Sequence, residues 1–367
     1  MAWGGQEIRI VTELKALPKM GWRVQLWAPK YSEIFQRSKR SQIPTEAVSF
    51  RGPLDVLSIL NLRRLIRERQ ADLIVTHSSI DSWVVGWATR SLTPRPRIVR
   101  TRHLSTPVRN FFPYRWFTDA ICTTSEDIRE GFLSAGIEAQ KVTCIATGVD
   151  RARFRPNPAM KETVRRNYHL PLDRPVVGGV FVIRSWKGIY DFVKIAAATP
   201  AAHFVVAGDG PSRAAMEGAA SQAGLAGRMT FLGHVEPVEE IFWALDVFLF
   251  PSTANEGIPQ ALLQAQASGV PAVVSDLASI REAAPHAIMC PAGDVAKFTS
   301  AVGELIRDPD RAAAVSTAGQ AAAERFDQAR ILPRIDEFYR GLIGSQLCPD
   351  HGRSASTIAL DGRDSAA

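Results

Sequence analysis

The residues with the greatest capacity for chemistry gather in the segment 248–276, which reads FLFPSTANEGIPQALLQAQASGVPAVVSD. A hydrophobic run typical of a strand leads into a loop that carries Glu256, and we expect a helix to begin near Pro259. Glu256 therefore follows the carboxyl end of a parallel strand, where open α/β sheets bind ligands. The free N–H groups and dipole of the following helix suit a diphosphate, and Gln264 lies about one turn into that helix.

Two basic residues lie together in the loop that follows another expected strand. Residues 181–188 read FVIRSWKG, in which Arg184 and Lys187 precede a helix that is expected to begin at Gly188. Cations on a strand-to-helix loop compensate the charge that develops on a departing diphosphate. Taken alone, the loop could also be a solvated basic turn, although the diphosphate interpretation is favoured.

A glycine-rich turn is the third chemical element. Residues 205–211 read VVAGDGP, so a hydrophobic strand ends in a turn formed by Gly208, Asp209 and Gly210. Gly-Asp-Gly is also an ordinary turn sequence, so this element gains meaning only beside the other two.

The elements that position these residues follow the order of parallel sheets flanked by helices, because short β-branched runs alternate with amphipathic segments. The expected strands are residues 23–28, 72–76, 97–100, 120–123, 141–145, 176–182, 203–207, 229–232, 247–251 and 272–275. The expected helices are residues 6–20, 54–69, 82–90, 126–135, 188–197 and 212–223, with Ser125 as the N-cap of the fourth.

The length of 367 residues exceeds what one hydrophobic core supports, so two α/β domains are expected. Residues 152–175 are rich in proline and charge, which is typical of a linker and hinge. We predict an N-terminal acceptor-side domain over 1–155, a C-terminal domain over 156–330, a helix over 331–345 that crosses back to the first domain, and a disordered tail over 346–367.

The sequence opens unusually for such a fold. A doubly wound domain begins with a strand that leads into its first glycine-rich turn, yet Gly4 and Gly5 follow almost directly after Met1. Either the first strand is missing, or the sheet begins with the strand that is normally second. We favour a missing first strand, through truncation or a misplaced start.

Positive charge is concentrated near the N-terminus. Residues 1–115 contain 20 Lys and Arg against 8 Asp and Glu, a local charge of +12 in a chain of net charge +7. This predicts either a solvated basic face or attraction to an anionic membrane surface or lipid-diphosphate acceptor. No nucleic-acid motif accompanies the charge, so nucleic acid is not an expected partner.

From the sequence we expect a cytoplasmic protein. No apolar run reaches the roughly 18 residues that a spanning helix needs, and the N-terminus has no secretory segment. The four cysteines are scattered, as is typical of reduced thiols.

The three chemical elements, in this order and spacing, resemble the family-4 retaining glycosyltransferases, and the resemblance extends over nearly the whole chain. In the N-terminal half it is carried by WGGQE, His77 of DLIVTHSS, Thr101-Arg102-His103, and TTSEDIREGFLSAGIEAQKVTCIATGVD. The resemblance implies a GT-B fold, with two Rossmann-like doubly wound parallel-sheet domains that face each other across a cleft. It also implies sugar transfer from a nucleotide-diphosphate sugar with retention of anomeric configuration.

The resemblance further implies roles for individual residues. Glu256 is expected to bond hydroxyls of the donor sugar, Arg184 and Lys187 to hold the diphosphate, and His103 to lie near the reacting sugar; these four are the expected catalytic residues. The remaining donor contacts are expected from the backbone of Gly257 and Ile258 and from the turns of Gly4, Gly5, Gly208, Asp209 and Gly210.

Two positions leave alternatives open. Gln264 stands where the family has a second Glu; because Gln both donates and accepts, it can still bond ribose hydroxyls, so the departure bears on the strength of ribose binding. His77 lies at the end of an expected strand, where a histidine is as often a structural residue as a functional one.

The expected mechanism uses no metal and no other cofactor. No acidic pair of the DxD kind lies on a strand-end loop, so Arg184 and Lys187 would take the place of a divalent ion. No carboxylate is clearly placed as a nucleophile, which favours front-face displacement, in which the leaving phosphate oxygen accepts the acceptor's proton.

We therefore predict a hexosyl transfer to a glycan or lipid-linked acceptor in bacterial cell-surface polysaccharide or lipopolysaccharide synthesis, at the cytoplasmic face of the inner membrane. Two alternatives stay open: a nucleotide-sugar epimerase or hydrolase on the same fold, and an inactive donor-binding regulatory subunit marked by Gln264. A dinucleotide oxidoreductase is poorly supported, because residues 4–7 read GGQE rather than GxGxxG.

Overall fold

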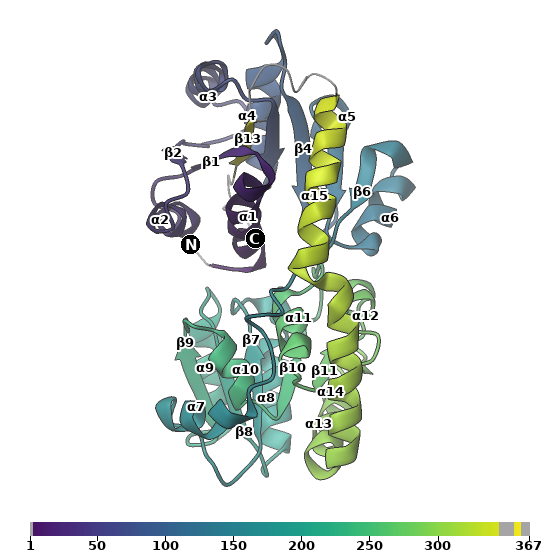
Figure 1. Ribbon diagram of the computed structural model, residues 1–367. Helices are drawn as coiled ribbons and strands as arrows, with labels where there is room; N and C mark the ends of the chain where they lie inside the picture. The colour runs from purple at the N-terminus through teal and green to yellow at the C-terminus, as the bar shows by residue number, and fades with distance from the viewer. Residues whose placement is uncertain (1–2, 345–355, 361–367) are drawn as a thin grey trace. The chain divides into compact units, whose positions relative to one another are not determined.

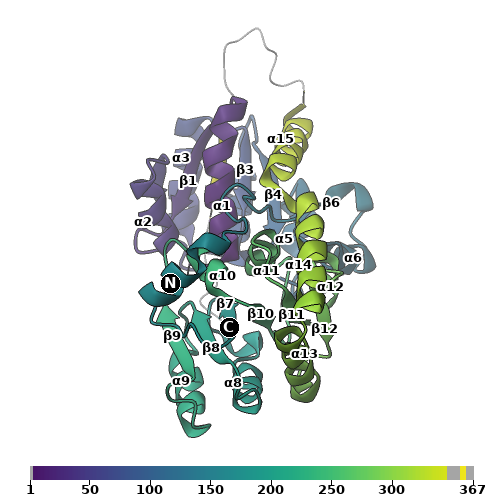
Figure 2. The same cartoon turned by 60° about the horizontal axis from the view of Figure 1, so that its bottom comes forward.

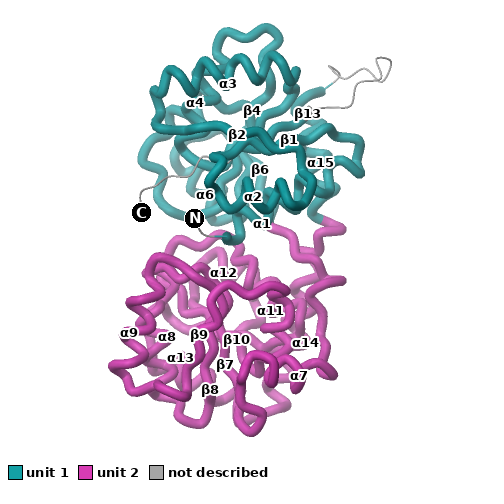
Figure 3. The backbone as a smooth tube through the Cα atoms, turned by 90° about the vertical axis from the view of Figure 1, so that its left-hand side faces the viewer, with its two compact units in different colours: residues 1, 3–146, 331–367 teal, residues 2, 147–330 magenta. Residues whose placement is uncertain are grey.

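The computed structural model describes residues 3–344 and 356–360, and the chain forms two compact units (Figure 3). Unit 1 contains Trp3–Ala146 and the chain from Ile331 onward, whereas unit 2 is the continuous segment Thr147–Arg330. The chain therefore first passes from unit 1 to unit 2 after Ala146, earlier than the predicted domain boundary at residue 155.

The sheet of unit 1, within the described residues, has seven strands in the order β2-β1-β13-β3-β4-β5-β6 (Figure 1). Every neighbouring pair is parallel. The strands are β1 (Arg23–Ala28), β2 (Thr45–Ala47), β3 (Leu73–Thr76), β4 (Arg97–Arg102), β5 (Ala120–Thr123), β6 (Val142–Cys144) and β13 (Ser356–Leu360).

Helices pack on both faces of this sheet and bury separate apolar clusters. The helices are α1 (Gly5–Ala16), α2 (Glu33–Arg40), α3 (Val56–Arg69), α4 (Ser79–Thr89), α5 (Phe112–Trp116), α6 (Glu126–Ser134) and α15 (Gln328–Ile343). One cluster joins α1, α2 and α15 to the sheet, a second joins α3 and α4 to it, and a third lies under α5 and α6. The unit is thus a layered α/β domain with a core on each side of its sheet.

The centre of the unit 1 sheet corrects one prediction. The prediction of a disordered tail over 346–367 is wrong for Ser356–Leu360, because these residues form β13 between β1 and β3. Ile358 lies opposite Gln25 of β1 and Ile74 of β3. Residues 357–360 are buried, because a strand in the middle of a parallel sheet is covered on both faces and an apolar run can fill that place. The other residues of the predicted tail lie outside the described residues.

The start of the chain is helical. Residues 3–22 contain α1 and a short 3₁₀ helix, Leu17–Met20, and no strand precedes β1 in this described stretch. The place between β1 and β3, which the first strand of a doubly wound sheet would hold, is occupied by β13.

Unit 2 has, within the described residues, a six-stranded parallel sheet in the order β12-β11-β10-β7-β8-β9. The strands are β7 (Val176–Val180), β8 (His203–Ala207), β9 (Met229–Gly233), β10 (Val247–Phe250), β11 (Ala272–Ser275) and β12 (Ile288–Cys290). The chain builds outward from β7 to β9 and then restarts beside β7 with β10. The boundary between β7 and β10 is therefore the topological switch point, where doubly wound sheets bind ligands.

The helices of unit 2 are α7 (Lys161–Asn167), α8 (Ile189–Ala198), α9 (Arg213–Gln222), α10 (Glu239–Ala244), α11 (Gln260–Ala267), α12 (Ala278–Ala283), α13 (Val295–Arg307) and α14 (Pro309–Ala323). Helices α9, α8 and α13 follow one another across one layer (Figures 1 and 2). Among the remaining helices, α7 contacts α10, and α11 contacts α14.

The prediction that residues 152–175 form a linker is wrong. This segment contains α7 and belongs to unit 2. The guanidinium of Arg165 and the ammonium of Lys161 each lie 2.6 Å from a different carboxylate oxygen of Asp246. These ion pairs fix the segment against the residues that precede β10. Among the helices that the structure describes, none is long and apolar enough to cross a membrane.

Candidate functional site

Three loops meet at the carboxyl edge of the unit 2 sheet, because β10, β7 and β8 are adjacent strands. The backbone N–H of Ile183, after β7, donates to the carbonyl of Asp209, after β8, at 2.9 Å. The N–H of Thr253, after β10, donates to the carbonyl of Trp186 at 2.7 Å. The three chemical elements of the sequence are thus brought together at the switch point.

Lys187 and Glu256 form a largely buried ion pair at the centre of these loops. The Lys187 Nζ lies 2.6 Å from Glu256 Oε1, and Glu256 is only 4% exposed. The Ser252 hydroxyl donates to the same Oε1, and the Ser279 hydroxyl donates to the main-chain carbonyl of Glu256 at 3.0 Å. Within the described residues both side-chain contacts of Glu256 go to Oε1, so Oε2 keeps its capacity to accept hydrogen bonds.

Arg184 does not join this pair. Its guanidinium lies over the Trp186 ring, 5.0 Å from the ring centroid, and it makes no ion pair with any residue that the structure describes. Arg184 is the N-cap of the short 3₁₀ helix Ser185–Lys187, so Arg184 and Lys187 lie in the same turn after β7. The guanidinium donors of Arg184 can therefore serve an anion at this edge.

Two glycines allow the loops to approach this closely. Gly188 has φ +67°, and a Cβ atom there would lie 1.9 Å from the Pro251 carbonyl oxygen. Gly208 has φ +139°, and a Cβ atom there would lie 1.9 Å from the Phe181 carbonyl oxygen. Any side chain at either position would push two of the three loops apart.

The remaining predicted donor residues of unit 2 lie in the loop after β8, in the loop before α11, and in α11 itself. The Asp209 carboxylate is exposed and accepts the N–H of Gly210 at 2.7 Å, so it shapes its own turn. Gly257 and Ile258 are buried in the loop before α11, whose N-cap is Pro259. Gln264 lies inside α11 and is 5% exposed.

A histidine pair lies at the carboxyl edge of the unit 1 sheet. His77 follows β3, His103 follows the neighbouring strand β4, and their Nδ1 and Nε2 atoms share a hydrogen bond of 3.0 Å. The rings stack with centroids 5.2 Å apart. The backbone N–H groups of His77 and Ser78 each donate to the carboxylate of Asp81 at 2.9 Å, which fixes the turn that carries His77.

Both histidines are held neutral. Burial lowers the pKa of His77 well below its ordinary value, and the nearby cations Arg100 and Arg9 lower it further. The pKa of His103 is lowered in the same way by burial, by His77 and by these arginines. A neutral pair has one N–H between the two facing nitrogens, so each ring fixes the tautomer of the other.

Gly4 and Gly5 form the beginning of α1 rather than a strand-to-helix turn. Gly4 is the N-cap, and its N–H donates to the Glu7 carboxylate at 2.8 Å. They belong to unit 1 with His103, whereas the other predicted site residues belong to unit 2.

Sequence reasoning missed the residues that hold the expected ones in place. Ser252, Ser279 and Asp81 are all buried, and each bonds a side chain or backbone group of the site described above. Ser252 follows a strand and precedes Glu256 by four residues, a spacing that would have flagged it. In the described part of the chain, no group of three or more His, Cys, Asp or Glu side chains is arranged to hold a metal ion.

Comparison with known families agrees with this architecture. The family model described as Glycosyltransferase Family 4 matches residues 3–153, and the one described as Glycosyl transferases group 1 matches residues 175–308. Fold and site define a GT-B protein with two Rossmann-like domains. The chain belongs to the family-4, group 1 glycosyltransferases.

Relatives of known name match parts of the chain. The 2-deoxystreptamine N-acetyl-D-glucosaminyltransferase of Streptomyces fradiae is 36% identical over 165 residues, which are 42% of this chain and 39% of that protein. A GDP-mannose-dependent alpha-(1-6)-phosphatidylinositol monomannoside mannosyltransferase of Mycobacterium tuberculosis is 31% identical over 242 residues, 61% of this chain and 62% of that protein. The matches thus span less than two thirds of either relative.

Solved structures share the fold over nearly their whole length. Anabaena HepE in complex with UDP has a TM-score of 0.79 at 20% identity, covering 92% of this chain and 97% of that one. A glycosyltransferase from Rickettsia africae has a TM-score of 0.82 at 15% identity, covering 94% and 96%.

Proposed function

We propose that this protein transfers a sugar from a nucleotide-diphosphate sugar to an acceptor hydroxyl, with retention of anomeric configuration. The observation that carries the proposal is the Lys187–Glu256 pair, which joins the loops after β7 and β10 at the switch point of unit 2. Family membership supports the same reaction class.

In the proposed reaction the diphosphate lies beside Lys187 and Arg184. Lys187 has three N–H donors, of which one serves Glu256, so two remain for phosphate oxygens. Arg184 supplies further donors, and within the described residues it has no ion pair to break before it binds a phosphate. Together the two cations offset the charge that grows on the leaving diphosphate, the role a divalent ion has in other transferases, so we propose a metal-independent reaction.

Glu256 is proposed to orient the donor sugar. Oε1 is held by Lys187 and the Ser252 hydroxyl, so the carboxylate is fixed while Oε2 accepts from a sugar hydroxyl. The bond between the anomeric carbon and the diphosphate oxygen breaks, and the acceptor oxygen bonds to the same carbon on the same face. The acceptor's proton passes to the departing phosphate oxygen, so no protein base is required.

The acceptor is proposed to be a glycan or a lipid-linked sugar at the cytoplasmic face of a bacterial membrane, in the synthesis of a cell-surface glycan. Two matched relatives are named for lipid acceptors, a phosphatidylinositol mannoside and an Escherichia coli diphosphoundecaprenol-linked sugar. The relative named for 2-deoxystreptamine supports a second candidate, a small soluble cyclitol acceptor.

The test is transfer from radiolabelled donors. Nucleotide sugars are first screened for a rise in melting temperature, and the donor found is incubated with and without lipid-linked and cyclitol acceptors. Label in an acceptor product, with activity that survives EDTA, is expected. Free labelled sugar formed without an acceptor would instead indicate a hydrolase. Conversion of the labelled donor to an isomeric nucleotide sugar would indicate an epimerase. Activity that is lost in EDTA and restored only by Mg²⁺ or Mn²⁺ would contradict metal independence.

A variant of Glu256 separates sugar recognition from nucleotide binding. Glu256→Gln should lower the rate of transfer about a hundredfold while the affinity for the free nucleoside diphosphate, measured by calorimetry, stays nearly unchanged. Equal loss of both would assign Glu256 a structural role.

A further inference from the structure

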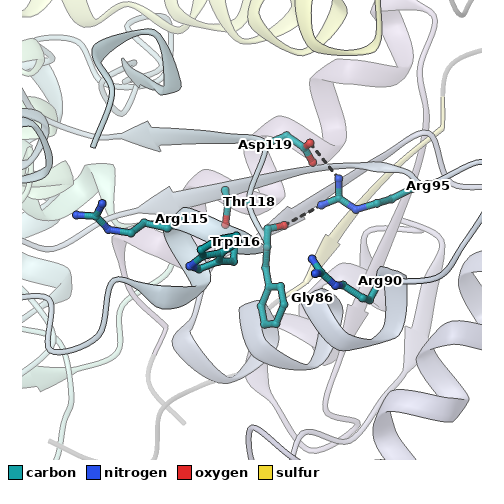
Figure 4. A pocket seen from close by; sticks show the side chains of 8 residues that line it. Gly86, Arg90, Arg95, Arg115, Trp116, Thr118 and Asp119 are labelled. Atoms are coloured by element: carbon teal, nitrogen blue, oxygen red, sulfur yellow. Dashed lines mark hydrogen bonds and ion pairs between the residues drawn. The ribbon is translucent and has the colours of Figure 1, made fainter. Parts of the chain in front are cut away.

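A basic surface cavity lies at the amino edge of the unit 1 sheet. It has a volume of about 330 Å³ and lies between the last residues of α4 and α5 and the segments that lead into β4 and β5. The histidine pair follows the carboxyl ends of β3 and β4, so this cavity is at the other edge of the sheet. Its lining includes three arginines and an indole, namely Arg90, Arg95, Arg115 and Trp116 (Figure 4).

The cavity carries excess positive charge. Arg95 donates to the Asp119 carboxylate and to the Phe117 carbonyl, both at 3.1 Å, and Arg115 donates to a backbone carbonyl at 2.7 Å. The Arg90 guanidinium makes no hydrogen bond or ion pair with any residue in the described ranges 3–344 and 356–360. The lining thus contains three guanidinium groups and one carboxylate, and the guanidinium of Arg90 is free to bind an anion.

Exposed aromatic rings accompany these cations. Figure 4 shows Trp116 between Arg115 on one side and Arg90 and Arg95 on the other. Trp116 is 62% exposed, and Phe112, one turn earlier on α5, is 40% exposed. Amphipathic aromatic rings beside basic side chains are typical of the interface between a bilayer and water.

Helix α3 extends the same face. It packs on α4, and the Arg63 guanidinium donates to the carbonyl of Ser91, the neighbour of Arg90, at 3.4 Å. Its solvent stripe carries two leucines, 74% and 56% exposed, followed by two arginines at helical spacing. In chain order these residues are Leu57, Leu60, Arg64 and Arg67.

We propose that this face of unit 1 docks on an anionic lipid bilayer. Arg90 and Arg95 bind a lipid phosphate in the cavity, while Trp116 and the leucines of α3 enter the headgroup region. Charge complementarity selects this occupant, because the face combines exposed apolar side chains with arginines and holds a single acidic residue in the cavity. The inference concerns a surface apart from the proposed reaction site, so it does not depend on the proposed function.

The test is flotation of the full-length protein with vesicles of phosphatidylcholine alone or with about 30% phosphatidylglycerol. We expect retention on the anionic vesicles at low salt and release near 0.5 M salt, since salt there limits the attraction between charges to a few ångströms. Arg90→Glu with Trp116→Ala should lower the partition coefficient on the order of tenfold or more. Leu57→Ser with Leu60→Ser, which changes only exposed side chains, should also lower it.

The matched control is Lys30→Glu with Tyr31→Ala. This pair is exposed, has the same change of charge and loss of one aromatic ring, and follows the carboxyl end of β1, at the other edge of the sheet. It should bind vesicles within about twofold of the parent protein. Equal losses in the control and cavity variants would overturn the proposal, as would equal binding to neutral and anionic vesicles or no binding at low salt.

Inorganic phosphate distinguishes a soluble anion from a lipid. If phosphate raises the melting temperature of the parent protein but not of the Arg90→Glu variant, and vesicles do not retain either, the cavity binds a soluble phosphate and the bilayer proposal is wrong. Because flotation needs neither donor nor acceptor, a protein that binds vesicles but transfers no sugar would refute only the proposed reaction.

Discussion

At the scale of single residues, the Lys187–Glu256 pair is better explained by positioning than by stability. Burying two charges costs several kcal/mol, which their attraction only partly offsets, so a buried pair is weak support for the fold. Here the pair shares its Oε1 with the Ser252 hydroxyl and spans two strand-end loops. A fixed carboxylate and a fixed ammonium are what a site needs when charge develops on a departing group.

Replacing the lysine tests this interpretation. Lys187→Ala should lower kcat about a hundredfold or more, because charge stabilisation is lost mainly in the transition state. Lys194→Ala, at an exposed lysine on α8, is the control and should leave kcat unchanged. Steady-state kinetics with the identified donor measures both. A Lys187→Ala enzyme that raises KM alone would mean that the lysine binds substrate and transition state equally.

The histidine pair predicts a pH dependence of stability. Above about pH 6.5 both rings are neutral in the folded and unfolded states, and no penalty arises. As the pH falls below that value, the histidines of the unfolded chain become protonated while the buried rings of the folded protein stay neutral. The free energy of unfolding therefore drops by about 1.4 kcal/mol per pH unit for each histidine.

Urea unfolding between pH 7.5 and 5.5 measures this slope. His77→Asn with His103→Gln removes both rings and should flatten it, even where the variant is less stable overall. An unchanged slope in the double variant would show that other groups set the acid stability.

At the scale of elements, the three strand-end loops of unit 2 depend on backbone shapes that only glycine adopts readily. Gly188→Ala should destabilise the protein by about 1–3 kcal/mol and lower activity, because its Cβ would collide with the Pro251 carbonyl and shift the turn of Lys187. Gly218→Ala is the matched control: this residue lies in α9 with nothing within 4 Å of its Cβ. It should stabilise by about 0.5–1 kcal/mol. Thermal unfolding distinguishes the two, and equal effects would contradict the collision argument.

At the scale of the whole molecule, the two units differ in how the chain builds them. Unit 2 is one continuous segment, whereas unit 1 needs α15 and β13 from the far end of the sequence. Within unit 1, Ile331 and Ile335 of α15 are buried, and the Tyr339 hydroxyl donates to the Glu13 carboxylate at 3.1 Å.

This asymmetry predicts the behaviour of fragments. Residues 147–330 expressed alone should unfold cooperatively and bind a nucleoside diphosphate, because both their core and their switch point are complete. Residues 1–146 alone should fail to fold, since the centre of their sheet and one helix of their core are absent. Circular dichroism and calorimetry test both fragments, and a cooperatively folded 1–146 would show that β13 is dispensable.

Local sequence patterns were sufficient to predict the alternation of strands and helices, because burial on both faces of a parallel sheet imposes apolar runs. The strands predicted at residues 23–28, 120–123 and 203–207 coincide with β1, β5 and β8, and the predicted N-cap Ser125 accepts the N–H of Ile128. The same patterns placed Glu256 and Lys187 at strand ends. Their contact could not be predicted in this way, since it depends on the strand order, which fixes which loops are neighbours. For the same reason β13 was missed: a five-residue run in a polar segment gives too weak a local signal, and only the open place between β1 and β3 makes it a strand.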